Sequence, residues 1–364
     1  MRVIMTGGGT GGHIYPAIAI ADKIKEMRPD AEIIFAGTKK GLEHTLVPKN
    51  GYDISYITVS GFDRKNLLRN VKTLSDLAKG MKESKELIKE FKPDVVIGTG
   101  GYVCGPVVKT AAKMGVRTFV HEQNAFPGVT NKMLEPYVEK VFLGFEEAGK
   151  YFKHKEKHIT VGNPVRKSFF TKTKEEARRT LGIGEDEFVV LSFGGSRGAG
   201  RINRSIMSVM DKIASEKDTR LFFGTGELYY DSIIHELEEK GITPGDNIKI
   251  MRYIDDMDNH LMASDVVISR SGALSVAEIA VCGKCAVFIP SPNVTGNHQY
   301  YNAKAIEDEG GAFLIEEKDL DDDLLAEKIL WLKNNEDELK KMGENSRKCA
   351  FTDSAEIIYN HIFR

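Results

Sequence analysis

A glycine-rich stretch near the beginning of the chain holds the first residues that could take part in chemistry. It covers residues 7–13, between an expected strand at 2–6 and an expected helix at 16–28, whose first turn would contain Pro16. A glycine turn before a helix presents open backbone N–H groups, so this stretch predicts a site for phosphate or another anion. His13 lies at the mouth of this site, and we interpret it as a general base because the pKa of imidazole lies near neutral pH.

Gly7, Gly9 and Gly12 also satisfy the glycine spacing of dinucleotide-binding proteins. That motif needs an acidic residue about 20 positions further on, at the end of the second strand. The second expected strand, at 32–36, is followed by residues 37–40, which include no carboxylate. The sequence therefore disfavours NAD binding, and we interpret the glycine-rich stretch as a binding site for phosphate or another anion.

Other glycine-rich or polar segments follow further expected strands. Because ligands bind at the carboxyl ends of parallel strands, we expect these segments to lie at the ligand-binding edges of the sheets. They cover residues 99–106, 121–124, 194–200, 269–278 and 296–302.

Composition limits the function classes. The chain is 41% hydrophobic and 29% charged with a net charge of −2, which gives no overall case for nucleic-acid binding. No run approaches the ~18 apolar residues of a membrane span, and no signal-peptide pattern is present, so we expect a cytoplasmic location. Four cysteines are too few for a disulfide framework. We interpret the C-x-x-C pair Cys282 and Cys285 as buried small residues, with a redox pair as the alternative.

Expected strands and helices alternate along the whole chain, which predicts an α/β protein with parallel, doubly wound sheets. The expected strand 188–193, the glycine loop 194–200 and the helix that follows repeat the opening unit, with Gly195 in the place of Gly8. Two Rossmann-like domains are therefore expected at 1–163 and 164–341. The expected strands are 2–6, 32–36, 54–58, 94–98, 117–120, 140–143, 188–193, 219–223, 248–251, 266–268, 286–289 and 312–315. Helices are expected near 16–28, 39–49, 66–90, 104–114 and 128–135 in the first half.

The segment 64–92 carries nine lysines and arginines against four acidic residues. Its apolar residues recur at roughly helical spacing. They are Leu67, Val71, Leu74, Ala78, Met81, Ile88 and Phe91. The spacing favours a surface helix with its apolar face in the core. The alternative is a basic, partly apolar patch that binds an anionic membrane surface.

Taken in order, the motifs resemble the peptidoglycan N-acetylglucosaminyltransferases that convert lipid I to lipid II. The matching segments are 8–13, 100–106, 121–124, 162–166, 194–199, 253–257, 269–278 and 299–303. The resemblance implies a GT-B fold, with two domains facing across a cleft and a C-terminal helix at about 342–364 returning to the first domain. It also implies UDP-N-acetylglucosamine (UDP-GlcNAc) as donor, lipid I at the inner membrane face as acceptor, and other cell-wall synthesis proteins as candidate partners. Arg197 and His298 depart from the family pattern, which has glutamine there.

Inverting transfer of the sugar requires a general base, positive charge that neutralises the departing pyrophosphate, and residues that bind the uridine and the sugar. The Glu278 carboxylate suits the two ribose hydroxyls, while Gln299 and Asn124 suit sugar hydroxyls. His13 and Glu122 are rival bases for the C4 hydroxyl of the acceptor, and the sequence does not separate them. The remaining donor-binding candidates are Thr10, Gly11, Gly12, Arg166, Gly194, Gly195, Ser196, Ala273, Leu274 and Ser275, with Ile254 at the uracil as the resemblance implies.

We expect no cofactor and no essential metal, because a helix dipole and an arginine can neutralise the leaving pyrophosphate. Asp256 and Asp258 imitate a metal-binding D-x-D motif in spacing only. Two alternatives remain open at this point: a UDP-N-acetylglucosamine 2-epimerase, and a non-catalytic module that binds nucleotide sugar or lipid.

Overall fold

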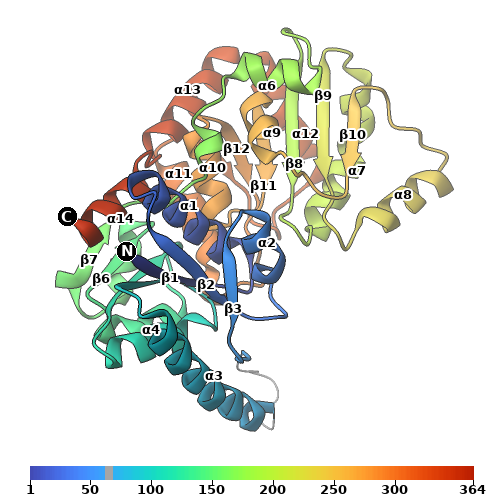
Figure 1. Cartoon of the computed structure of the whole chain (residues 1–364). Coiled ribbons are helices and arrows are strands. Elements are labelled where there is room, and N and C mark those ends of the chain that lie inside the picture. Colours follow the sequence, from blue (N-terminus) through green and yellow to red (C-terminus); the bar gives the residue numbers. More distant parts are fainter. Residues whose placement is uncertain (62–68) are drawn as a thin grey trace. The chain divides into compact units, whose positions relative to one another are not determined.

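The computed structural model describes residues 1–61 and 69–364, without the side chains of residues 69–72, 211, 214 and 295. The chain divides into two compact units, Met1–Arg166 with Phe351–Arg364 and Lys167–Ala350 (Figure 1). Each unit contains one parallel sheet, so the predicted α/β class with two Rossmann-like, doubly wound domains is confirmed.

The sheet of the first unit has the order β3-β2-β1-β4-β5-β6-β7. Its strands are β1 (Arg2–Gly7), β2 (Glu32–Gly37), β3 (Asp53–Tyr56), β4 (Val95–Gly100), β5 (Arg117–Glu122), β6 (Lys140–Leu143) and β7 (His158–Thr160). The central strands are nearly continuous apolar runs, as expected for strands buried on both faces. The strand order reverses between β1 and β4, so the loops that follow these two strands form the topological switch point of the unit, which is where open α/β sheets bind their ligands.

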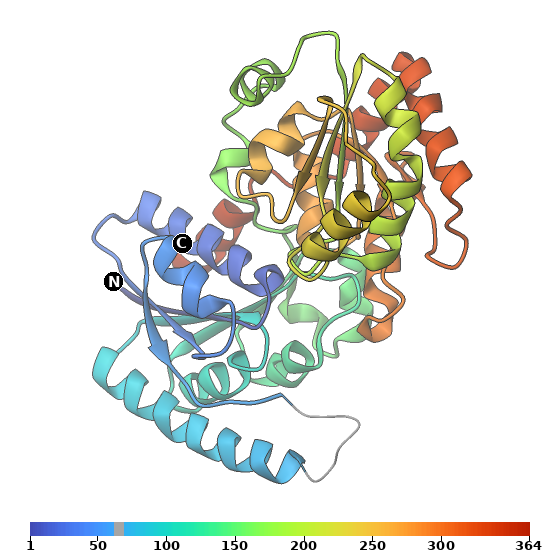
Figure 2. The same ribbon diagram turned by 90° about the vertical axis from the view of Figure 1, so that its right-hand side faces the viewer.

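Helices cover both faces of this sheet. One face carries α1 (Gly11–Met27), α2 (Glu43–Lys49) and α14 (Ser354–Phe363), and the other carries α3 (Arg69–Phe91), α4 (Cys104–Lys113) and α5 (Val129–Leu134). The helices α3 and α4 lie side by side (Figure 2). Short 3₁₀ turns occur at η1 (Glu135–Tyr137), η2 (Glu146–Tyr151) and η3 (Lys155–Lys157).

The sheet of the second unit has the order β10-β9-β8-β11-β12-β13, which reverses between β8 and β11. Its strands are β8 (Phe188–Phe193), β9 (Thr219–Gly224), β10 (Ile248–Met251), β11 (Val266–Ser269), β12 (Cys285–Phe288) and β13 (Ala312–Leu314). Its helices are α6 (Lys174–Leu181), α7 (Gly200–Ser215), α8 (Tyr230–Glu239), α9 (Met257–Ala263), α10 (Ala273–Val281), α11 (His298–Asp308), α12 (Asp322–Asn334) and α13 (Glu336–Lys348), with 3₁₀ turns η4 (Lys167–Phe169) and η5 (Thr295–Asn297).

Three local expectations differ from the structure. The helix α1 begins at Gly11, so the prediction that Pro16 lies in its first turn is wrong; Pro16 gives up one backbone hydrogen bond but is buried in the core. The edge strand β7 was not expected, because three residues are too few to show a periodicity. In place of one helix over 342–364 there are two, α13 and α14, and Phe351 between them packs against Gly162.

The buried face of α3 agrees only in part with the face that the apolar spacing predicts. Ile88 is buried as expected, but Leu74 and Ala78 are exposed, and Gly80 and Ser84 are buried in their place. Gly80 allows the helix to approach the segment after β3 so closely that a Cβ would lie 2.4 Å from the carbonyl oxygen of Thr58. Residues 62–68, which include Leu67, lie outside the described residues.

The cysteine pair is structural. Cys282 and Cys285 are free and buried, and burial raises the pKa of each thiol to about 12 because it disfavours the thiolate. The interpretation as buried small residues is therefore confirmed.

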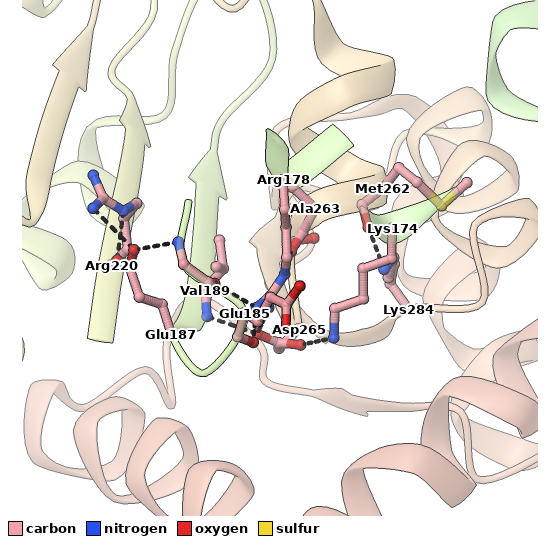
Figure 3. A network of polar contacts seen from close by, with 12 residues as sticks. Lys174, Arg178, Glu185, Glu187, Val189, Arg220, Met262, Ala263, Asp265 and Lys284 are labelled. Atoms are coloured by element: carbon pink, nitrogen blue, oxygen red, sulfur yellow. Dashed lines mark hydrogen bonds and ion pairs between the residues drawn. The ribbon is translucent and has the colours of Figure 1, made fainter. Parts of the chain in front are cut away.

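A buried ionic cluster stabilises the amino edge of the second sheet (Figure 3). Asp265, which precedes β11, accepts hydrogen bonds from Lys174 (2.5 Å), from Arg178 (2.7 Å) and from the backbone N–H of Val189 (2.7 Å). The side chains of Arg178 and Asp265 are 7% and 8% exposed. A charge this deeply buried depends on its partner, because water cannot replace the lost interaction.

Replacing Asp265 with asparagine is therefore expected to lower the free energy of unfolding by about 3–5 kcal/mol, since Arg178 would remain buried without its counter-ion. Urea unfolding measures the change. Asp323→Asn is the matched control, because its bond to Lys212 joins two exposed side chains and contributes little. Equal free energies of unfolding of the two variants would contradict the role of Asp265 as the counter-ion of the buried Arg178.

Candidate functional site

Two glycine-rich loops meet at the switch point of the first unit. The backbone N–H of Gly8, after β1, donates to the carbonyl oxygen of Gly100, at the end of β4, over 3.3 Å. Gly101 has φ = +86°, and a Cβ there would lie 2.4 Å from the carbonyl oxygen of Gly8. A side chain at Gly101 would therefore push the two loops apart, and the glycines are needed for this close approach.

His13 lies in the first turn of α1, against these loops. Its Nδ1 lies 3.0 Å from the carbonyl oxygen of Gly8. A carbonyl oxygen only accepts hydrogen bonds, so neutral His13 carries its proton on Nδ1 and has its basic lone pair on Nε2. Gly100, with φ = +106°, leaves room for the ring, since a Cβ there would lie 2.7 Å from His13 Cδ2. The imidazole is thus oriented as a general base would be.

The anion site predicted in the first loop is altered by a carboxylate of the chain itself. The N–H of Gly9 donates to Glu43 Oε2 over 2.9 Å, so the expectation that the N–H groups of this loop are open to a ligand is wrong at Gly9. Thr10 precedes α1 in an extended conformation, and Gly11 and Gly12 form the first turn of the helix. These three residues keep the electrostatic character of a helix N-terminus.

Glu122, the rival base, accepts hydrogen bonds from several residues of the β5–α5 loop and of α5 itself. Its Oε1 accepts from the backbone N–H and the side-chain amide of Asn124, at 3.0 and 3.2 Å. Its Oε2 accepts from the N–H of Gly128 at 3.0 Å and from the amide of Asn131 at 2.9 Å. Glu122 is 2% exposed. Both carboxylate oxygens are occupied by donors of this loop and of α5, and this arrangement suits a loop-forming role better than proton abstraction.

The residues around Glu122 form a buried polar network. His121 Nε2 lies 2.9 Å from the carbonyl oxygen of Gly162, and its Nδ1 lies 2.9 Å from the amide nitrogen of Gln123. Burial lowers the pKa of His121 to about 4, so this ring is neutral at neutral pH. Asn163 donates to the carbonyl oxygen of Gln123 over 3.0 Å. The network fixes the position of the loop that carries Asn124.

Arg166 ends the first unit and stacks on an aromatic ring of α1. Its guanidinium carbon lies 4.8 Å from the centre of the Tyr15 ring, which is a cation–π geometry. Tyr15 follows His13 by two residues, so α1 orients both the candidate base and the candidate pyrophosphate-binding arginine.

The second unit repeats the switch-point arrangement after β8. Gly195 and Gly198 have φ of +88° and +81°, and the N–H of Gly198 donates to the carbonyl oxygen of Gly195 over 2.9 Å. This tight turn leads into α7 and leaves Gly195 and Ser196 exposed, with Gly194 half-buried at its start. A turn of this kind before a 16-residue helix can hold a phosphate group.

The loop after β11 and the start of α11 are joined by buried hydrogen bonds. Ser271 Oγ donates to the carbonyl oxygen of Gln299 over 2.8 Å, and Asn302 donates to the carbonyl oxygen of Ser271 over 3.1 Å. Gln299 Oε1 accepts from the N–H of Ser291 over 2.9 Å, which directs its amide nitrogen away from that bond. Glu278 lies half-buried on α10, whose first turn contains Ala273, Leu274 and Ser275.

Ile254 is buried, and its side chain packs against Gly224 at the end of β9. The two carboxylates of the D-x-D sequence have separate partners: Asp256 lies 3.0 Å from His260 Nδ1, and Asp258 lies 2.6 Å from Lys172. In residues 1–61 and 69–364, no group of three or more histidine, cysteine, aspartate or glutamate side chains is arranged to hold a metal ion.

Sequence reasoning missed Glu43 and Asn131, and it gave Asn302 no role of its own within the segment 296–302. Glu43 follows the second strand by six residues and lies on the next helix, so the search for an acid at the strand end passed over it. Asn131 and Asn302 lie inside helices, where asparagine is an unfavourable residue. An asparagine inside a helix was therefore the sequence feature that could have identified these two residues.

Comparison with known proteins identifies the family. The glycosyltransferase family 28 N-terminal domain matches residues 3–143, and the corresponding C-terminal domain matches residues 189–358. The chain is 46% identical over 364 residues to the UDP-N-acetylglucosamine–N-acetylmuramyl-(pentapeptide) pyrophosphoryl-undecaprenol N-acetylglucosamine transferase of Ruminiclostridium cellulolyticum, covering 100% of this chain and 99% of that relative.

Among solved structures, MurG from Acinetobacter baumannii superimposes with a TM-score of 0.76 at 25% identity, covering 99% of each chain. A putative UDP-N-acetylglucosamine 2-epimerase from Listeria monocytogenes has a TM-score of 0.73 at 16% identity, covering 99% of this chain and 95% of that one. The second likeness concerns the fold alone. The two domain matches and the full-length identity show that this chain belongs to glycosyltransferase family 28.

Proposed function

We propose that the protein transfers N-acetylglucosamine from UDP-GlcNAc to the C4 hydroxyl of the N-acetylmuramyl residue of lipid I, which forms lipid II for peptidoglycan synthesis. The observation that carries this proposal is the 46% identity, over the full chain, to a relative named for this transfer. The epimerase alternative has only a likeness of fold at 16% identity to support it.

In the proposed reaction the acceptor O4 attacks C1 of the donor sugar on the side opposite the pyrophosphate. The O4–C1 bond forms while the bond from C1 to the phosphate oxygen breaks, and UDP leaves with the bonding electrons. His13 Nε2 takes the hydroxyl proton, which is consistent with the Nδ1 contact to the Gly8 carbonyl. One displacement inverts the configuration at C1, so an α-linked donor gives a β-linked product.

The second unit supplies the proposed donor-binding groups. Glu278 accepts hydrogen bonds from the ribose hydroxyls, and Gly194, Gly195 and Ser196 in the turn before α7 bind the pyrophosphate. Backbone groups of Ile254 bind uracil, and the Gln299 amide nitrogen donates to a sugar hydroxyl. Ala273, Leu274 and Ser275 bring the N-terminus of α10 to the donor.

The first unit supplies further proposed contacts. Arg166, held on Tyr15, neutralises charge as UDP departs, and the amide of Asn124 binds a sugar hydroxyl. The helix N-terminus at Thr10, Gly11 and Gly12 favours the anionic part of a substrate.

The assay that tests the proposal incubates the protein with UDP-GlcNAc, with and without a soluble lipid I analogue. We expect release of UDP only when the acceptor is present. Conversion of the donor to its manno epimer without acceptor would favour the epimerase, and binding without turnover would favour a non-catalytic module.

We further propose that the protein docks peripherally on the cytoplasmic face of the membrane, where lipid I is anchored. Among the described residues, no helix is long and apolar enough to cross a bilayer. The support for docking is the basic segment 64–92, together with Leu74 on α3, which is 57% exposed. Other cell-wall synthesis proteins are candidate partners.

Binding to anionic phospholipid vesicles is expected to fall steeply with salt, because each basic residue near the surface contributes about 1 kcal/mol that ions screen. Charge reversal at Arg64, Lys65, Arg69 and Lys72 is expected to abolish co-sedimentation and to spare turnover of a soluble acceptor. The control variant reverses the charge of four exposed lysines of the second unit, Lys212, Lys240, Lys318 and Lys341. Equal loss of vesicle binding in both variants would remove the segment from the docking surface.

A further inference from the structure

The Glu43 carboxylate lies inside the first glycine loop. Glu43 begins α2 and is 1% exposed. Its Oε2 accepts from the N–H of Gly9 at 2.9 Å, and its Oε1 accepts from the N–H and the hydroxyl of Thr38 at 2.9 and 2.7 Å. Three donors to one buried carboxylate fix its orientation.

Three glycines form the space that this carboxylate fills. A Cβ at Gly8 would lie 2.7 Å from Glu43 Oε1, one at Gly37 would lie 2.7 Å from Cγ, and one at Gly41 would lie 2.0 Å from Oε2. These glycines come from the β1–α1 loop, the end of β2 and the turn before α2. The chain thus places its own anion beside the glycine loop, at the kind of turn where nucleotide-binding proteins hold a phosphate.

The same peptide group connects Glu43 to His13. The carbonyl oxygen of Gly8 and the N–H of Gly9 belong to one planar trans peptide, whose two polar ends point in opposite directions. The N–H end donates to Glu43, and the carbonyl end lies 3.0 Å from His13 Nδ1. A hydrogen bond accepted by the carboxylate polarises the peptide and strengthens the bond that its carbonyl accepts.

We propose that Glu43 is a positioning residue for His13, which it orients through the Gly8–Gly9 peptide. The series carboxylate, peptide, imidazole takes the place of the direct carboxylate–histidine bond that orients the base in other enzymes. Glu43 fixes the plane of the peptide, and the peptide fixes both the ring orientation and the Nδ1–H tautomer. This inference rests on the proposed role of His13 as the base, but its geometric part is measurable without turnover.

Glu43→Gln tests the proposal, because glutamine has the same shape and must direct its NH₂ group toward a donor at Gly9 or Thr38. We expect kcat to fall about 10- to 100-fold, the range seen when the outer partner of a metal-bound histidine is removed, with the KM for UDP-GlcNAc unchanged. The acidic limb of the pH–kcat profile, where protonation of His13 removes the base, should move to lower pH, since a less polarised carbonyl stabilises the imidazolium less.

Glu135→Gln is the matched control. Glu135 is a buried carboxylate of the same unit that accepts from the backbone N–H groups of Lys153 (3.0 Å) and His154 (2.7 Å) and pairs with His158. The same change there is expected to lower stability without altering kcat or its pH profile. If both variants lose the same stability and keep the same kcat, Glu43 is only structural and the proposal is overturned.

Nitrogen-15 spectra of histidine-labelled protein give the second readout. His13→Gln identifies the His13 signals among the nine histidines of the chain. Neutral wild-type His13 is expected to carry its proton on Nδ1, and Glu43→Gln is expected to reduce that tautomer. Unchanged His13 signals in Glu43→Gln would overturn the proposal. Altered signals together with full turnover of His13→Gln would reject the base assignment and leave the positioning intact.

Glu43→Asp is measured in the same way and serves if the glutamine variant does not fold. Aspartate keeps the charge but is too short to reach both Gly9 and Thr38. It is expected to give a smaller loss of kcat and a partial shift of the tautomer. A wild-type tautomer and kcat in this variant would count against the proposal.

Discussion

Replacing His13 with alanine is expected to lower turnover by roughly 10²–10⁴-fold, which is the usual contribution of a positioned general base. Affinity for UDP-GlcNAc should remain nearly unchanged, because His13 is not one of the proposed donor-binding residues and most of these lie in the second unit. Steady-state kinetics with a soluble acceptor and calorimetry with UDP separate these two effects. His154→Ala is a suitable control, because His154 is a half-exposed histidine of the same unit.

The result also decides between the two candidate bases. Glu122 accepts four hydrogen bonds from its own loop, so Glu122→Ala is expected to act through a loosened loop and a lower stability. If His13→Ala keeps its turnover while a stably folded Glu122→Ala has none, the two assignments must be exchanged.

The second large effect is expected at Glu278. Glu278→Ala should weaken UDP binding by ~1.5–3 kcal/mol, or roughly 10- to 150-fold in Kd, because it removes charge-assisted bonds to the ribose. Folding should be little affected, since the side chain is only half-buried on α10. Calorimetric titration with UDP measures the change.

Glu239→Ala provides the comparison for Glu278, because Glu239 is an exposed glutamate at the end of another helix of the same unit. UDP should bind this variant as it binds the unchanged protein. Equal UDP affinities in the Glu278 and Glu239 variants would reject the ribose assignment.

The positions of most strands along the chain, and of the loops that follow them, were predictable because they depend on local patterns. Buried parallel strands are short apolar runs, and glycine turns follow them at both switch points, near Gly8 and Gly195. His13 stood out for the same reason, as a polar ring beside such a turn. These features depend on neighbours in the sequence, which a single chain displays.

The parts that were not predictable depend on contacts between distant residues. Glu43 reaches back 34 positions to Gly9, and Asn302 reaches 31 positions to Ser271, and no spacing rule connects such pairs. The burial of α3 through Gly80 and Ser84 was missed because small residues carry little hydrophobic signal. Whether Glu122 abstracts protons or organises a loop likewise depends on donors that only the folded chain brings together.

The return of α14 to the first unit has a consequence for biosynthesis. Ile358, Tyr359 and Ile362 complete the core on the face that α1 covers, although β1 to β7 are all translated before Arg166. At the usual ~5–20 residues per second, synthesis of residues 167–353 takes roughly 10–40 s. During that interval the nascent first unit has an apolar strip of α1 that α14 does not yet cover. We therefore expect a ribosome-bound fragment that ends before Ser354 to be a substrate for nascent-chain chaperones and to release them once α14 has emerged.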